Sequence, residues 1–207
     1  MGTIPIFTLP IFFNNPTLPT RTIYGFMDDF GRASASNLGF TSREAKPWVS
    51  SLAAGITSGI DASGAAYFAR DSGGAAQVVV DSKAPNGTLL ATMKVKTAPG
   101  QAGVAFRWSN AQNYFTFSTL ASGAGSYRIN KVVANVTTVM ATTTDVIPAN
   151  GDVLKVVLAG DLITCYVNGV QILQLTDTHN RTATSHGLYN TEATTVARWD
   201  DVSFTAA

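Results

Sequence analysis

The sequence predicts an all-β protein built as an antiparallel β-sandwich, and two observations indicate this fold class. Glu, Lys, Gln and Arg, which favour helices, are scarce, whereas Thr, Val, Ile and aromatic residues are frequent. Short runs of alternating or β-branched residues also recur along the chain, with turn signals rich in Gly and Asn between them. Many short strands at this spacing are typical of sandwiches and barrels.

The expected strands follow one another from residue 65 to residue 204. They are residues 65–69, 76–80, 88–96, 102–108, 113–119, 126–133, 153–158, 162–167, 170–175 and 196–204. The clearest signal is the meander formed by three of these strands, at residues 153–158, 162–167 and 170–175. Its loops, Gly160-Asp161 and Asn168-Gly169, are two-residue hairpin turns, because these residues tolerate a positive φ. Cys165, within its middle strand, is expected to be a small buried side chain.

The N-terminal segment is predicted to be a separate, extended arm. Prolines at positions 5, 10, 16 and 19 exclude a helix, and the apolar run is about half the roughly 20 residues of a membrane span. An extended arm cannot bury Phe7, Ile11, Phe12 and Phe13 against itself. We therefore expect residues 1–26 to anchor the protein to a partner or neighbouring subunit, ahead of one domain at 27–207. Packing of the arm on its own domain is the alternative.

Composition excludes several classes of function. Charged residues make up 13% of the chain and the net charge is +1, which argues against binding of nucleic acid and of anionic membranes. A single cysteine excludes an internal disulfide, and two histidines are too few for a His-rich metal centre. We expect no cofactor.

Several segments resemble the concanavalin A-like lectin/glucanase, or laminin-G-like, jelly roll. They are residues 160–172 (GDLITCYVNGVQI), 102–118 (AGVAFRWSNAQNYFTFS), 126–132 (SYRINKV) and 28–33 (DDFGRA), the last of which returns at 199–204 (WDDVSF). The similarity of the first and last strands implies that they pair in one sheet. The opening at 28–48 (DDFGRASASNLGFTSREAKPW) is similar to tail proteins of actinobacterial phages, including mycobacteriophages.

The resemblance implies a minor tail protein of a phage virion, assembled in the host cytoplasm, that binds host-surface glycans or serves in particle assembly. Other tail proteins would hold its arm, and a homo-oligomer such as a trimer is expected. Location on the capsid surface, as a decorating protein without a ligand, is one alternative. A glycoside-hydrolase-like enzyme acting on envelope polysaccharide is another.

An enzymatic function is not expected from the residues. Glycoside hydrolysis normally takes two carboxylates across one cleft, and the related glucanases supply them from an ExDxE strand motif that is missing here. The only glutamates, Glu44 and Glu192, lie far apart in the sequence. No Gly-x-Ser-x-Gly elbow is present either. Lectins of this type often hold calcium, but the Asp28-Asp29 and Asp200-Asp201 pairs are interpreted as strand ends.

The candidate sugar-binding residues lie near one predicted hairpin, because sugars are bound by aromatic rings together with amide and guanidinium groups. They are Arg107, Trp108, Asn113, Tyr114 and Tyr127. Strict alternation places Phe106 and Trp108 on one face and Arg107 on the other. Arg107 and Trp108 can share a face only if the strand ends or bulges at Trp108. In the alternative interpretation, Arg107 pairs with an interior carboxylate and the aromatic residues fill the core.

Overall fold

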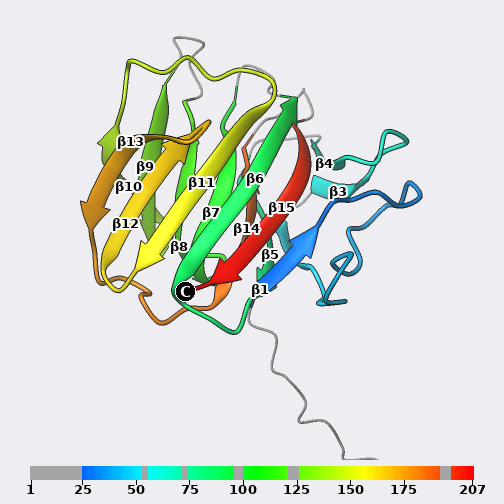
Figure 1. Ribbon diagram of the computed structural model, residues 1–207, viewed down its shortest axis with the longest axis horizontal. Coiled ribbons are helices and arrows are strands. Elements are labelled where there is room, and N and C mark those ends of the chain that lie inside the picture. Colours follow the sequence, from blue (N-terminus) through cyan, green and yellow to red (C-terminus); the bar gives the residue numbers. More distant parts are fainter. Residues whose placement is uncertain (1–24, 53–55, 71–73, 96–99, 121–125, 192–196) are drawn as a thin grey trace, which may run out of the picture.

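The structure is a computed structural model that describes residues 25–52, 56–70, 74–95, 100–120, 126–191 and 197–207. The strands of these residues form two antiparallel sheets that face each other (Figure 1). Within the described ranges there is no helix long and apolar enough to cross a membrane.

One layer is an eight-stranded sheet in the order β13-β12-β11-β6-β15-β4-β3, with β1 also paired to β15. Its strands are β1 (Gly25–Asp28), β3 (Ile56–Ile60), β4 (Ala66–Arg70), β6 (Gly87–Val95), β11 (Asp152–Ala159), β12 (Leu162–Val167), β13 (Val170–Thr176) and β15 (Arg198–Ala206). The pairing of β1 with β15 confirms that the first and last strands lie side by side.

The other layer is a seven-stranded sheet in the order β10-β9-β8-β7-β14-β5-β2. Its strands are β2 (Val49–Leu52), β5 (Ala76–Asp81), β7 (Ala102–Asn110), β8 (Asn113–Thr119), β9 (Tyr127–Val133), β10 (Val136–Thr142) and β14 (Ser185–Asn190). The first described residue, Gly25, already pairs with Thr205, although the sequence prediction starts the domain at residue 27.

The hairpins of the meander are formed as predicted. Ala159 pairs with Leu162 across the first turn, and Val167 pairs with Val170 across the second, so each loop has two residues. Gly160, Asn168 and Gly169 have φ values of 59°, 51° and 83°, the left-handed conformation that such turns require. Cys165 between these turns is completely buried, as expected.

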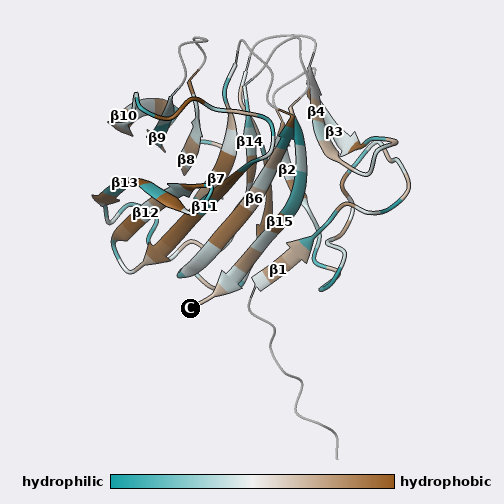
Figure 2. Cartoon of the chain, turned by 45° about the horizontal axis from the view of Figure 1, so that its top comes forward, coloured by the Kyte–Doolittle hydropathy of each residue, from teal (hydrophilic) through white to brown (hydrophobic). Residues whose placement is uncertain are grey.

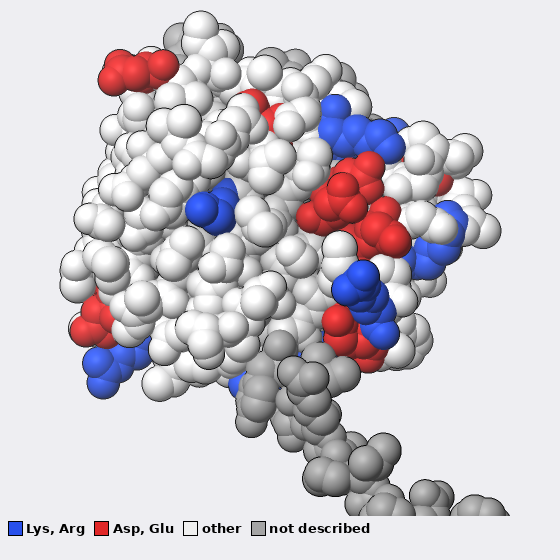
Figure 3. All heavy atoms as spheres, in the orientation of Figure 1, with Lys and Arg blue, Asp and Glu red and all other residues white. Residues whose placement is uncertain are grey.

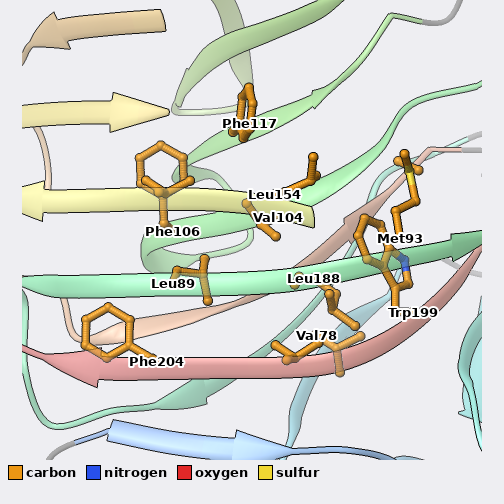
Figure 4. Close-up of a cluster of buried hydrophobic side chains, with 14 of the residues drawn as sticks. Val78, Leu89, Met93, Val104, Phe106, Phe117, Leu154, Leu188, Trp199 and Phe204 are labelled. Atoms are coloured by element: carbon orange, nitrogen blue, oxygen red, sulfur yellow. The ribbon is translucent and has the colours of Figure 1, made fainter. Parts of the chain in front are cut away.

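The hydrophobic core fills the space between the two sheets (Figure 4). Trp199 and Phe204 enter it from β15, and Phe106 and Phe117 enter it from β7 and β8. None of these four side chains is more than 2% exposed. The hydrophobic colouring along β11 and β12 in Figure 2 shows strands that contribute to the same core.

Two acidic side chains, one at the end of β1 and one in the segment that follows it, accept hydrogen bonds from other residues of the domain. The buried carboxylate of Asp28 accepts hydrogen bonds from the Arg32 guanidinium at 2.6 Å and from the Trp48 indole N–H at 2.7 Å. Glu44 accepts a hydrogen bond at 2.7 Å from the backbone N–H of Met27. Asp28 and Glu44 therefore satisfy local donors.

The face of the molecule seen in Figure 3 carries few charges. Acidic groups gather in the right half of this view with basic groups beside them, and the left half is largely uncharged apart from one basic group and groups at its edge. This view shows no basic stripe of the kind that binds a nucleic-acid backbone.

Candidate functional site

The outer face of the seven-stranded sheet carries a second apolar cluster, separate from the core. It consists of Val79, Ala105, Tyr114, Val132 and Tyr189, with Ala75 and Trp108 packed against them. The sequence neighbours of these residues, such as Val78, Val104 and Phe115, belong to the core between the sheets. Strand alternation therefore directs two different sets of apolar side chains to the two faces of this sheet.

A hollow of about 360 Å³ lies on this outer face. The residues that line it share a lack of charge, and they are Ser51, Leu52, Ala75, Gln77, Ala111, Tyr114, Val132, Asn135 and Thr137. They come from β2, β5, β8, β9, β10 and the adjoining turns. The hollow thus combines amide, hydroxyl and apolar groups, and no Asp or Glu is among its described lining residues.

An aromatic hydroxyl in the hollow is held in place by an amide. The Gln77 Nε2 group donates to the Tyr114 hydroxyl at 3.1 Å, and the Tyr114 and Tyr189 ring centroids are 6.3 Å apart. Burial raises the pKa of Tyr114 to about 12, and the protonated hydroxyl, which accepts from Gln77, retains a proton to donate. Further along the same two strands, β8 and β9, Asn130 Nδ2 donates to the Thr116 hydroxyl at 3.1 Å.

Polar capacity on the same sheet is not used up by contacts within the protein. The Oδ1 atom of Asn130 and the hydroxyl of Ser118 are buried and have no hydrogen-bond partner among the described residues. Buried polar atoms in native proteins are usually hydrogen-bonded.

The strand pairing places Ser118 beside Gly103, where a Cβ atom added to the glycine would lie 2.2 Å from the Phe117 carbonyl oxygen. Only glycine therefore fits at residue 103.

Three of the predicted site residues lie on or beside this face. Tyr114 lines the hollow, and Trp108 packs against the cluster that includes Tyr114. Asn113 lies in the adjoining hairpin, where its Nδ2 donates to Asn110 Oδ1 at 3.0 Å and its Oδ1 accepts from the N–H of Ala134 at 3.3 Å. The side chain of Asn113 is therefore engaged in holding the hairpin.

Arg107 lies in the interior instead. It has no exposed surface, and its guanidinium donates to the backbone carbonyl of Asp177 at 3.0 Å and to that of Gly160. Burial lowers the pKa of Arg107, and the nearby charges of Asp161 and Asp177 oppose this shift. The interior partners are carbonyl groups, where the alternative interpretation had expected a carboxylate. Arg107 bridges elements of the two sheets and does not face the hollow.

Tyr127 is likewise a core residue. Its hydroxyl donates to Asp152 Oδ2 at 2.6 Å, and its ring centroid is 5.4 Å from that of Phe117. Burial raises the pKa of Tyr127, with the Asp152 carboxylate adding to the shift. For Tyr127 the structure therefore agrees with the interpretation in which aromatic residues fill the core.

Sequence reasoning missed the part of the face that comes from distant strands. Ser51, Gln77 and Thr137 line the hollow but lie outside the predicted hairpin of residues 102–119, near which the candidate residues were sought. A polar Gln77 at the start of an apolar strand was the one available signal. The predicted anchoring residues, Phe7, Ile11, Phe12 and Phe13, lie outside the described residues.

Comparison with known proteins establishes the fold. Neither protein-family models nor curated proteins give a match to this chain. Among solved structures, the chain is similar to a β-glucanase from Bacillus licheniformis, with 11% identity, a TM-score of 0.58, and coverage of 90% of this chain and 100% of that chain. It is also similar to the GH43 protein BlXynB from Bacillus licheniformis, with 12% identity, a TM-score of 0.56, and coverage of 87% of this chain and 39% of that chain.

A third similar structure is the apo Crh5 transglycosylase, with 13% identity, a TM-score of 0.55, and coverage of 89% of this chain and 85% of that chain. Together with the two antiparallel sheets, these likenesses confirm the predicted fold class, an all-β jelly-roll sandwich of the concanavalin A-like type. At such low identity they carry no information on the activity of this chain.

Proposed function

We propose that this protein binds carbohydrate on the outer face of the seven-stranded sheet. The observation that carries the proposal is the uncharged hollow, whose lining includes the hydrogen-bonded pair Tyr114 and Gln77 together with Ser51 and Thr137. Pyranose rings pack against aromatic and apolar surfaces, and their hydroxyl groups bond to amides and hydroxyls. Trp108 on the same face offers a second aromatic surface.

A pair of neighbouring threonines on β10 provides the test. Thr137 lines the hollow, whereas the adjacent Thr138 does not, and both are exposed. The Thr137→Arg variant fills the hollow, so we expect at least a tenfold loss of affinity for the glycan that the wild type binds. The matched Thr138→Arg variant should keep wild-type affinity.

The measurement is a glycan array that includes bacterial cell-envelope polysaccharides, followed by calorimetry on the strongest hit. Thermal unfolding of both variants controls for stability. The proposal fails if the wild type binds no glycan, or if Thr137→Arg and Thr138→Arg bind equally well.

We further propose that binding is not followed by hydrolysis. The described lining residues include no carboxylate, although glycosidases use two. Glu44 is bonded to the backbone of Met27, and Glu192 lies outside the described residues. Incubation with the bound polysaccharide should release no reducing ends. Release that disappears in the Glu192→Gln variant would instead assign a glycoside hydrolase.

The proposed setting is a phage virion, with the protein as a minor tail component held by its N-terminal arm. Support comes from the sequence of the arm, which combines prolines with apolar residues, and from the resemblance of residues 28–48 to phage tail proteins. Replacing Phe7, Phe12 and Phe13 by Asp in the full chain should leave the sandwich folded and the protein absent from purified particles. Normal incorporation of this triple variant would refute the anchoring role, and immunogold labelling would separate tail from capsid.

A further inference from the structure

The strand β7 contains an irregularity at Arg107. This residue has a φ of 47°, a left-handed conformation that residues other than glycine rarely adopt within a strand. Against β14, Ala105 pairs with Gly187 and Trp108 pairs with Ser185, so β7 has one residue more than its partner over this stretch. The irregularity is a β-bulge, and bulges of this kind redirect side chains near functional sites.

The bulge changes which face Trp108 occupies. Phe106 belongs to the core, and the next residue, Arg107, is also completely buried. Trp108 then packs on the outer face against the cluster of Ala105 and Tyr114. Regular alternation would have placed Trp108 on the same side as Phe106, inside the sandwich.

Hydrogen bonds to the backbone and the guanidinium of Arg107 hold this conformation, although its Nε atom has no partner among the described residues. Its N–H donates to the His186 Nδ1 atom at 3.3 Å, and its carbonyl accepts from Asn180 Nδ2 at 3.1 Å. Its guanidinium donates to the carbonyls of Gly160 and Asp177. Unusual backbone conformations persist only when the surrounding structure determines them in this way, and they cluster at functional sites.

The contacts of Asn180 extend the same restraint to the hairpin that follows. Its Nδ2 group also donates to the carbonyl of Asn113 at 3.0 Å, so one amide joins both strands of the β7–β8 hairpin. Ala111, within this hairpin, lines the hollow.

We propose that Arg107 is a positioning residue of the carbohydrate site through its backbone: the bulge at its positive φ turns Trp108 onto the binding face, and the Asn180 amide bonded to its carbonyl holds the hairpin at the margin of that face. This inference rests on the proposed function. Arg107 acts without touching the ligand, because its side chain points into the interior.

Two substitutions distinguish the effect of losing the bulge from the effect of losing the buried guanidinium. Both Arg107→Gly and Arg107→Val leave the carbonyls of Gly160 and Asp177 without their donor. Glycine adopts a positive φ readily, whereas a β-branched valine strongly disfavours it. Arg107→Gly should therefore keep the bulge, and Arg107→Val should straighten the strand and turn Trp108 inward.

Acrylamide quenching of tryptophan fluorescence reports the position of Trp108 without any ligand. Trp108 is partly exposed, whereas Trp48 and Trp199 are buried with 8% and 0% of their surface exposed, so a change in the position of Trp108 should change the quenching. We expect Arg107→Gly to quench like the wild type and to bind the glycan within threefold of it. For Arg107→Val we expect at least a twofold lower quenching constant and at least tenfold weaker binding. Equal quenching and equal binding by the two variants would overturn the proposal.

A second variant covers the case in which neither of these folds. Asn180 has a φ of 51°, so Asn180→Gly preserves the backbone while removing the amide that holds the hairpin. Its affinity should fall at least fivefold, and wild-type affinity would overturn the proposal. If the wild type binds no glycan, the proposed function fails, and the quenching comparison still decides whether Arg107 sets the position of Trp108.

Discussion

His186 should make the stability of this protein depend on pH between about pH 4 and 6.5. It is completely buried on β14, and its ring is stacked on Phe204 with centroids 4.2 Å apart. Burial lowers the pKa of His186 to about 4; the Ala84 carbonyl opposes this shift, and the Arg107 charge adds to it. The Nδ1 atom accepts the N–H of Arg107, which favours the neutral ring.

The sign of the effect follows from the two states of the chain. In the unfolded chain a histidine binds a proton below about pH 6.5, whereas folded His186 remains neutral until about pH 4. Lowering the pH within this window therefore favours the unfolded state. A difference of about 2.5 pKa units corresponds to about 3 kcal/mol of unfolding free energy, lost progressively from pH 6.5 to pH 4. Above pH 6.5 this contribution is constant.

Urea denaturation followed by tryptophan fluorescence, at steps of half a pH unit from 7.5 to 4.5, measures the effect. The His186→Phe variant keeps a ring against Phe204 but cannot titrate, so its free energy of unfolding should lack this slope. The carboxylate of Asp61 acts at lower pH. For Asp61, burial is outweighed by hydrogen bonds from Ser63 and Arg198 that lower its pKa to about 2. Parallel pH profiles for wild type and His186→Phe would refute the reasoning.

Two further predictions concern buried positions. Gly103→Ala should destabilise the fold by more than about 3 kcal/mol, because its Cβ would lie 2.2 Å from the Phe117 carbonyl oxygen, whereas Gly169→Ala meets no atom within 4 Å and should cost only about 1 kcal/mol of backbone strain. Chemical denaturation of the two variants checks the difference, and similar losses would contradict it. Cys165 should resist thiol reagents in the native state, because it is completely buried and burial raises its pKa. Labelling with a disulfide reagent should occur only at urea concentrations that unfold the chain, and rapid labelling without urea would show that this strand opens locally.

The strands that the sequence predicted are those whose patterns depend on burial. The ten predicted runs correspond to β4–β9, β11–β13 and β15, because alternating or β-branched residues reflect a sheet with a buried face. The strands β2, β3, β10 and β14 were missed, and β1 was expected only through the similarity of residues 28–33 to the last strand. β10 is an edge strand of mostly exposed Thr and Val, and β14 contains Gly187 and His186, which give no strand signal. These strands are specified by pairing with their neighbours more than by their own composition.

Only some of the predicted binding residues lie on the outer face of the seven-stranded sheet, and Arg107 illustrates the reason. The prediction identified Trp108 and Tyr114, and both lie on the outer face. Whether Arg107 shares that face depends on a bulge, which is determined by His186, Gly160 and Asp177 through contacts across 53 to 79 residues of sequence. A periodicity argument can state that a bulge would change the result, but such distant contacts decide whether it forms.

The low charge content acquires a structural meaning when the positions of the charges are considered. Several charged groups are used within the fold, as in the ion pairs of Arg32 with Asp28 at 2.6 Å and of Lys131 with Asp177 at 2.7 Å. Arg107, which could have brought a positive charge to the hollow, is turned inward by the bulge. The proposed binding face, built from Tyr114, Gln77 and hydroxyl groups, would then discriminate through shape and hydrogen bonds, with little dependence on salt. Such a face suits a neutral glycan, and weak contacts of this kind gain strength when several copies bind one surface at once.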